Sequence, residues 1–213
     1  MPAPLTKICG LRTAEALDAA IAARADYAGF NFYAPSPRFV SGGEVSALGA
    51  QAAGRITRVG VFVDADDALI GGMVATGALD VLQLHGSEPP ARAAALRARY
   101  GLPVWKVLSV STRDDIARAH AYAGAANFIL FDAKTPKGTL PGGMGLVFDW
   151  SLLSGWDRAL PWGLAGGLSP ANVADAARAT GAPLVDTSSG VESAPGVKDA
   201  DLIAAFCRNA RGA

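Results

Sequence analysis

The chain has 213 residues, of which 51% are hydrophobic and 18% charged, and its 19 basic and 19 acidic residues cancel to a formal net charge of zero. This composition is typical of a globular protein with a large buried core, and the balanced charge gives no electrostatic footprint for nucleic acid. No apolar run approaches the ~18 residues that a membrane span needs. We therefore expect one soluble, cytoplasmic domain spanning residues 1–213 that binds neither nucleic acid nor membrane.

Eight short apolar runs, of the length typical of buried parallel strands, recur at intervals of about 22 to 34 residues. They begin near Leu5, Tyr27, Ile56, Val81, Val104, Asn127, Pro161 and Pro183. Each is followed by an alanine-rich segment with helical periodicity, an alternation that predicts parallel strands joined by right-handed crossovers. Eight units with nothing left over predict an α/β protein that forms a single (β/α)8 TIM barrel. A doubly wound sheet is the alternative, but the first strand–helix turn, Cys9–Thr13, lacks a G-x-G-x-x-G fingerprint.

Helix-start signals accompany three of these segments. They are Thr13 with Glu15, Ser87 with Glu88, and Thr112 with Asp115. A hydroxyl at the N-cap and an acidic side chain in the first turn satisfy or complement free amide groups, so each pair predicts a helix that begins at this point.

Two stretches near the end of the chain, Leu164–Pro170 and Val185–Glu192, begin as apolar strands and break into glycine and serine. Glycine permits positive φ and lets a ligand approach the main-chain amides. Ser169 followed by Pro170 predicts an N-cap with proline at the first helical position. Free amides at such turns attract phosphate, and TIM barrels commonly hold phosphate after their last two strands. Two ordinary strand–helix turns are the alternative.

Cys9 ends the first strand, where the following glycine leaves it accessible. Lys7 points to the same face of the strand and would lower the pKa of the thiol, which makes it a better base or nucleophile. A buried, inert cysteine is the alternative, and Cys207 in the last helix fits that description. Because the two cysteines lie far apart and neither has a His or Cys neighbour at metal-ligand spacing, we expect no disulfide framework and no metal site.

Several polar residues stand at the ends of other predicted strands. Arg38 follows two prolines, which stiffen its approach and suit it to a carboxylate or phosphate, although a solvated arginine is the alternative. Gln83 and His85 alternate with apolar residues and face the barrel interior, where His85 is either a general acid or base or a hydrogen-bonded structural residue. Asp132 and Asp186 each end an apolar strand. Partial desolvation favours Asp132 as an acid catalyst.

Alternatives remain for both aspartates: Asp132 could be a cap or the partner of Lys134 or Lys106, and Asp186 could be a structural anchor. Two longer loops, Tyr33–Gly43 and Lys134–Leu146, are either lids over the site or disordered surface loops. The predicted site therefore combines phosphate-binding turns with a thiol, a carboxyl group and an arginine. This combination favours acid–base chemistry on a small phosphorylated substrate.

An ordered series of motifs runs through nearly the whole chain: Lys7–Gly10, Gly29–Phe32, Ser36–Arg38, Val59–Val63, Leu82–Gly86, Phe131–Lys134, Phe148–Trp150, Leu164–Leu168 and Asp186–Glu192. Together these motifs resemble the phosphoribosylanthranilate isomerase family. The resemblance implies an Amadori rearrangement in tryptophan biosynthesis, which converts N-(5-phosphoribosyl)anthranilate to 1-(2-carboxyphenylamino)-1-deoxyribulose 5-phosphate without a cofactor.

The resemblance also implies roles for individual residues. Cys9 would be the general base that removes the proton from ribose C2′, and Asp132 the general acid that protonates the furanose oxygen. Arg38 would bind the anthranilate carboxylate. The phosphate-binding residues would be Gly166, Gly167, Ser189 and Gly190. We add His85 to the substrate-binding residues, and we leave monomer and homodimer open.

One loop departs from the family pattern. The family's Gly-Gly-Thr/Ser-Gly-Lys is replaced here by a sequence with Met144 and Leu146 at the hydroxyl and basic positions. Two other functions remain to be weighed against the isomerase. An aldose–ketose isomerase of the histidine pathway would rely on an aspartate pair, which Cys9 argues against. A non-catalytic barrel that binds phosphorylated metabolites would be expected to have lost a catalytic residue.

Overall fold

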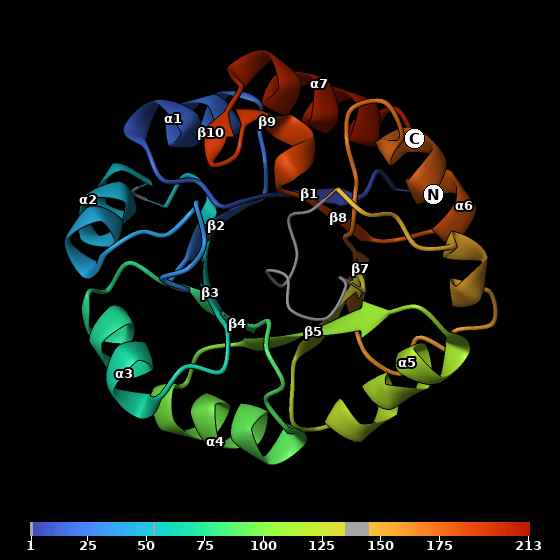
Figure 1. The fold of residues 1–213 in the computed structure, drawn as a ribbon, viewed down its shortest axis with the longest axis horizontal. Coiled ribbons are helices and arrows are strands. Elements are labelled where there is room, and N and C mark those ends of the chain that lie inside the picture. Colours follow the sequence, from blue (N-terminus) through green and yellow to red (C-terminus); the bar gives the residue numbers. More distant parts are fainter. Residues whose placement is uncertain (1, 53, 135–144) are drawn as a thin grey trace.

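The computed structural model describes residues 2–52, 54–134 and 145–213. Over these residues, eight parallel strands pair in sequence order and close into a barrel, which Figure 1 views down its axis. The strands are β1 (Leu5–Cys9), β2 (Tyr27–Asn31), β3 (Thr57–Phe62), β4 (Val81–Leu84), β5 (Val104–Val110), β6 (Phe128–Ala133), β7 (Trp162–Leu164) and β8 (Leu184–Thr187). The predicted (β/α)8 barrel is confirmed, and each strand begins within one residue of its predicted start.

Helices form an outer ring around the strands (Figure 1). They are α1 (Ala14–Ala22), α2 (Gly42–Ala52), α3 (Asp67–Ala75), α4 (Pro90–Tyr100), α5 (Arg113–Ala117), α6 (Val173–Thr180) and α7 (Ala200–Arg211), with 3-10 turns η1 (Arg118–Tyr122), η2 (Trp150–Leu153) and η3 (Ser189–Val191). Thr13 caps α1, and Thr112 forms a capping box with Asp115 at α5, as predicted. None of the described helices is long and apolar enough to cross a membrane.

Two predicted helix starts are wrong. Helix α4 begins at Pro90 after Pro89, not after Ser87, because the neighbouring Glu88 is buried and pairs with Lys106. Helix α6 begins at Val173 with Asn172 at the N-cap, because the chain turns once more after Ser169 before the helix forms.

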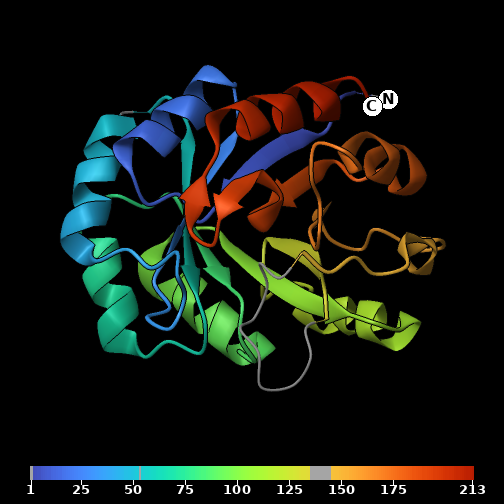
Figure 2. The ribbon, with the colours of Figure 1, turned by 45° about the horizontal axis from the view of Figure 1, so that its top comes forward.

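Two connections also differ from the expected strand–helix pattern. Between β6 and β7 the described residues contain η2 instead of an α-helix. After β8 the chain forms η3 and then a hairpin of β9 (Glu192–Ala194) and β10 (Val197–Lys198) before α7. Figure 2 shows α7 lying along β1, with the two chain ends side by side.

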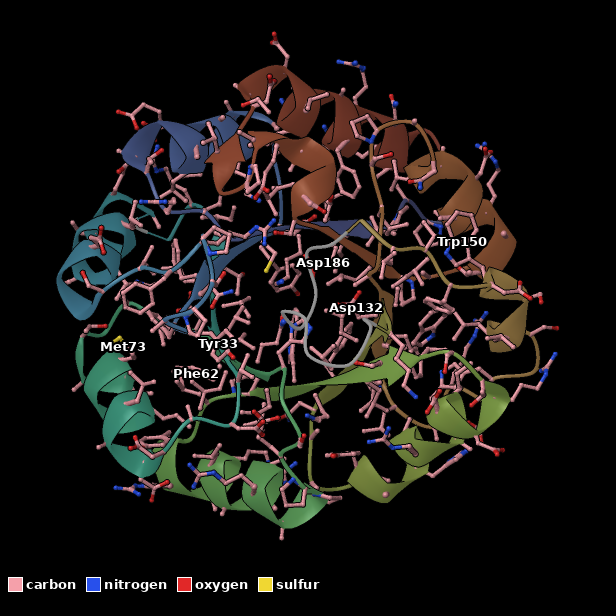
Figure 3. All side chains as sticks on the ribbon, in the orientation of Figure 1. Tyr33, Phe62, Met73, Asp132, Trp150 and Asp186 are labelled. Atoms are coloured by element: carbon pink, nitrogen blue, oxygen red, sulfur yellow. The ribbon has the colours of Figure 1, made fainter. Side chains whose placement is uncertain are left out.

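Two apolar layers hold the barrel together. Alternate strand residues point inward, and the interior is filled by a cluster that includes Trp105 and Phe128, whose rings stack at 4.6 Å between centroids. The other strand residues pack under the helices, as Phe62 does on the side of α3 in Figure 3. These aromatic side chains stand near the amino ends of β5 and β6 and fill that end of the interior. The polar inward-facing residues therefore lie at the carboxyl ends of the strands.

Candidate active site

A cavity opens at the carboxyl ends of the strands and encloses about 710 Å³, including open space at its mouth. Seven of the eight predicted site residues line it: Cys9, Arg38, His85, Asp132, Gly166, Gly167 and Ser189. In Figure 3, Asp132 and Asp186 lie inside the ring of strands, whereas Trp150 lies in the outer layer. Parallel strands from distant parts of the sequence therefore bring the predicted thiol, carboxyl groups and glycine turns to one place.

Cys9 stands at the end of β1 and is 9% exposed. Burial raises the pKa of its thiol, while the nearby Lys7 acts in the opposite direction. Lys7 is itself fully buried and lies 3.1 Å from Asp186 Oδ1. Although burial lowers the pKa of Lys7, the carboxylate of Asp186 holds it above its usual range. The expected effect of Lys7 on Cys9 therefore exists, but desolvation outweighs it.

Asp132 stands at the end of β6 and is held at both oxygens. Its Oδ1 accepts a hydrogen bond from the amide of Ala133 at 2.8 Å, and its Oδ2 lies 3.2 Å from His85 Nε2. Gln83 Nε2 lies 3.3 Å from the other ring nitrogen of His85. With the amide nitrogen donating to Nδ1, the imidazole proton is on Nε2 and faces Asp132. His85 thus orients the carboxyl group from the adjacent wall of the cavity.

The proposed ion partners of Asp132 are wrong. Lys106 Nζ pairs with Glu88 at 2.7 Å, with both side chains buried, and donates to the carbonyl of Gly86 at 2.6 Å. Lys134 Nζ lies 4.0 Å from Asp115. Lys106 therefore joins β5 to the loop that follows His85 and stabilises that loop, and its charge is paired with Glu88 instead of Asp132.

Arg38 reaches the cavity from the loop after β2 and forms two hydrogen bonds to Glu192. Its Nε lies 2.7 Å from Oε1, and its Nη2 lies 2.7 Å from Oε2. The side chain of Arg38 is 10% exposed and that of Glu192 is 4% exposed. A Cβ on Gly10, whose φ is +75°, would lie 2.5 Å from Arg38 Cδ, so glycine is required there to let the arginine pass. The alternative of a solvated arginine is therefore wrong.

The two glycine turns meet after β7 and β8. Gly166 and Gly167 have φ of +86° and +62°, a conformation that glycine adopts without strain. Within the described part of the chain, the amides of these two glycines donate to no protein acceptor. Such unpaired amides in a turn form a concave site for an anion.

Gly190 has a different position from the other predicted phosphate-binding residues, since it does not line the cavity. A Cβ at this residue would lie 2.0 Å from the carbonyl oxygen of Leu168. Thr187 Oγ1 donates to the same oxygen at 2.6 Å. Gly190 therefore lets the turn after β8 pack against the turn after β7.

The cavity also contains polar residues that the sequence analysis did not single out: Asn31, Tyr33, Thr187 and Ser188. Thr187 and Ser188 belong to the second glycine–serine stretch, so their position after β8 was a usable signal. Glu192 also belonged to a quoted motif, but nothing local indicates that it contacts Arg38. Of the loop Lys134–Leu146, residues 135–144, Met144 included, lie outside the described residues.

The fold and the position of the cavity define a TIM-barrel enzyme, since barrels of this kind carry their active sites at the carboxyl ends of their strands. Residues 6–209 match the family model described as N-(5'phosphoribosyl)anthranilate (PRA) isomerase. The chain belongs to this family. The expectation of an isomerase in tryptophan biosynthesis is confirmed, and it prevails over the histidine-pathway and non-catalytic alternatives.

Individual relatives are similar to this chain over nearly its full length. The N-(5'-phosphoribosyl)anthranilate isomerase of Paramagnetospirillum magneticum is 54% identical over 97% of this chain and 96% of its own length. The crystal structure of the enzyme from Thermotoga maritima is 35% identical, with a TM-score of 0.88 over 99% of this chain and 100% of that one. A further solved structure, 33% identical with a TM-score of 0.86 over 99% of this chain and 100% of that one, is a complex with reduced 1-(o-carboxyphenylamino)-1-deoxyribulose 5-phosphate.

Proposed function

We propose that this cavity converts N-(5-phosphoribosyl)anthranilate to 1-(2-carboxyphenylamino)-1-deoxyribulose 5-phosphate, with Cys9 as general base and Asp132 as general acid. The observation that carries the proposal is that a thiol at the end of β1 and a carboxyl group at the end of β6 line one cavity. The complex of a structural relative with a reduced form of this product supports the choice of substrate.

The reaction proceeds in two proton transfers. Asp132 gives its proton to the furanose oxygen, the bond from that oxygen to C1′ breaks, and the anthranilate nitrogen forms a protonated Schiff base with C1′. Cys9 as thiolate then removes the proton from C2′, and the electron pair of that bond neutralises the Schiff base to an enolamine. The enolamine tautomerises to the amino-ketone product. His85 keeps the carboxyl group of Asp132 directed at the substrate through its contact of 3.2 Å.

The substrate is held at its two anionic ends. Its phosphate binds the amides of Gly166, Gly167 and the Ser189 turn, which form a main-chain site after β7 and β8. Its carboxylate binds Arg38, which enters from the loop after β2. Anchoring both ends places the ribose between Cys9 and Asp132 and lowers the entropic cost of the proton transfers.

The direct test follows the loss of substrate fluorescence when purified protein is added to N-(5-phosphoribosyl)anthranilate. We expect turnover by the wild-type chain, with the Arg38→Ala variant showing a raised KM and a smaller change in kcat, because its charge acts in binding. Absence of turnover on substrate of verified integrity would refute the proposed reaction. An unchanged KM for Arg38→Ala would refute only the proposed contact of Arg38 with the substrate carboxylate and would leave the proposed reaction standing.

We further propose that residues 1–213 act as one catalytic domain in the cytoplasm, as a monomer or a homodimer. The proposal is supported by the position of Cys9, Arg38 and Asp132, which line one cavity within the described part of a single chain. Sedimentation equilibrium combined with activity measured across the monomer–dimer concentration range tests this. A specific activity that falls to zero on dissociation would contradict it.

A further inference from the structure

We propose that Lys198 and Glu192 are positioning residues that hold Arg38 in place and preserve its charge for an anionic group on the substrate's aromatic ring. They would thereby set a preference for a carboxylated ring over a neutral one. This inference rests on the proposed function, in which Arg38 binds that carboxylate. Neither Lys198 nor Glu192 lines the cavity, so both act through Arg38.

The carboxylate of Glu192 lies between two cations. Its Oε1 accepts from Arg38 Nε and from Lys198 Nζ, each at 2.7 Å. Its Oε2 accepts from Arg38 Nη2 at 2.7 Å and from the amide of Gly196 at 3.3 Å. Four donors thus fix the carboxylate, and the carboxylate fixes the plane of the guanidinium.

The charges of this cluster explain why a lysine is needed. A buried arginine paired with one carboxylate forms a neutral unit that attracts a further anion weakly. In the described part of the chain, the carboxylate of Glu192 forms ion pairs with both Arg38 and Lys198, so one negative charge faces two positive charges and pairing with Glu192 does not cancel them. The side chain of Lys198 is only 1% exposed, and solvent therefore screens its charge little.

The hairpin β9–β10 presents these residues because it packs directly on the loop of Arg38. A Cβ on Gly196, whose φ is +79°, would lie 2.5 Å from the carbonyl oxygen of Pro37. Only glycine allows this close approach of the hairpin turn to the residue that precedes Arg38. Figure 2 shows the hairpin at the same end of the barrel as the loop after β2.

Lys198 also connects the cluster to the thiol side of the cavity. Its Nζ donates to the carbonyl of Ser188 at 2.9 Å, and the hydroxyl of Ser188 donates to the carbonyl of Cys9 at 3.1 Å. If Lys198 were purely structural, these contacts would affect the binding affinity of every ligand of the cavity equally. A lysine that preserves the charge of Arg38 would matter most for ligands with an anionic ring, and this difference makes the proposal testable.

The test measures binding of two product analogues by calorimetry. One is reduced 1-(2-carboxyphenylamino)-1-deoxyribulose 5-phosphate, and the other is its phenylamino counterpart without the carboxylate. We expect the wild-type chain to prefer the carboxylated analogue by at least about tenfold. Lys198→Met should lose most of this preference and leave the neutral analogue within about twofold of wild type, whereas Lys198→Arg should restore the preference.

Glu192→Gln provides a second, nearly isosteric variant, verified as folded by circular dichroism, in case Lys198→Met does not fold. It should also weaken the preference, but through positioning: its amide has one acceptor oxygen in place of two, so it no longer accepts from both Arg38 Nε and Arg38 Nη2 and no longer fixes the plane of the guanidinium. Arg178→Gln is the matched control: it removes one exposed positive charge on α6, at a residue that does not line the cavity, and should keep the preference. In steady-state assays, Lys198→Met should raise KM and leave kcat within about twofold.

Equal weakening of both analogues in Lys198→Met and Glu192→Gln would show a structural role and overturn the inference while the proposed function stands. If Arg178→Gln also lost the preference, the effect would come from the net charge of the protein, and the inference would be overturned as well. A wild-type chain that binds both analogues equally would instead refute the carboxylate role of Arg38, and with it the inference.

Discussion

The two walls of the cavity are built differently. The wall formed after β7 and β8 presents main-chain amides of Gly166 and Gly167, in backbone conformations that glycine favours. The wall that flanks it presents side chains: Cys9 at the end of β1, Asp132 at the end of β6, and Arg38 from the loop after β2. Each of these side chains has a polar partner: Lys7 lies beside Cys9, His85 beside Asp132, and Glu192 beside Arg38.

This difference separates binding from chemistry. Amides in a rigid turn can hold an anion, but they do not titrate near neutral pH, so the glycine wall is suited to anchoring phosphate. The side-chain wall contains the groups that can exchange protons. Substitutions in the glycine wall should therefore change KM more than kcat, and substitutions of Cys9 and Asp132 should do the opposite.

The largest effect is expected on the side-chain wall. Cys9→Ala and Asp132→Asn should each lower kcat by at least about 10²-fold, because each removes one partner of the acid–base pair. KM should change little, since neither residue anchors phosphate or carboxylate. Steady-state fluorescence assays of the purified variants measure both constants. A near-wild-type kcat in either variant would refute the role assigned to the substituted residue.

The next effect concerns pH. Because burial raises the pKa of the Cys9 thiol, the protonated form predominates at neutral pH and the thiolate fraction grows as pH rises. The value of kcat/KM should therefore increase with pH from neutral into the alkaline range, by up to about tenfold per unit. A pH–rate profile measures this, with the residual activity of Cys9→Ala as the control. A flat wild-type profile would argue against the thiolate as base.

On the glycine wall, Gly167→Ala should raise KM by about five- to tenfold, because alanine at positive φ costs about 1–2 kcal/mol and disturbs the turn. A Cβ there would also lie 2.7 Å from the carbonyl oxygens of Gly145 and Leu146. Inhibition by inorganic phosphate should weaken in parallel. A raised KM with unchanged phosphate inhibition would place the phosphate elsewhere.

The smallest effect should come from Ser189→Ala. If the phosphate is held by main-chain amides, removal of the hydroxyl should change KM by less than about threefold, while the backbone of η3 stays in place. Gly167→Ala, measured under the same conditions, is the comparison. A Ser189→Ala effect larger than that of Gly167→Ala would show that side chains dominate this wall too.

Much of this architecture could be predicted along the chain. Strand starts followed from short apolar runs, and the caps at Thr13 and Thr112 followed from hydroxyl–acid pairs, because these signals involve residues a few positions apart. Ser87 and Ser169 looked like similar signals but do not begin helices. After Ser87, Glu88 pairs with Lys106, 18 positions away, which the local pattern does not contain. After Ser169, Asn172 accepts from the amide of Ser169 and forms a turn ahead of the helix.

The sequence by itself determined the barrel, the face that carries the cavity, and seven of the eight residues assigned to the site, because inward and outward positions alternate along parallel strands and loops at one end converge. Only the tertiary structure decided which buried charges pair. The pairs Lys7–Asp186, Lys106–Glu88 and Arg38–Glu192 each join residues 18 to 179 positions apart. Such pairings depend on strand register and loop packing, since a buried charge is stable only where the closed barrel brings it a partner.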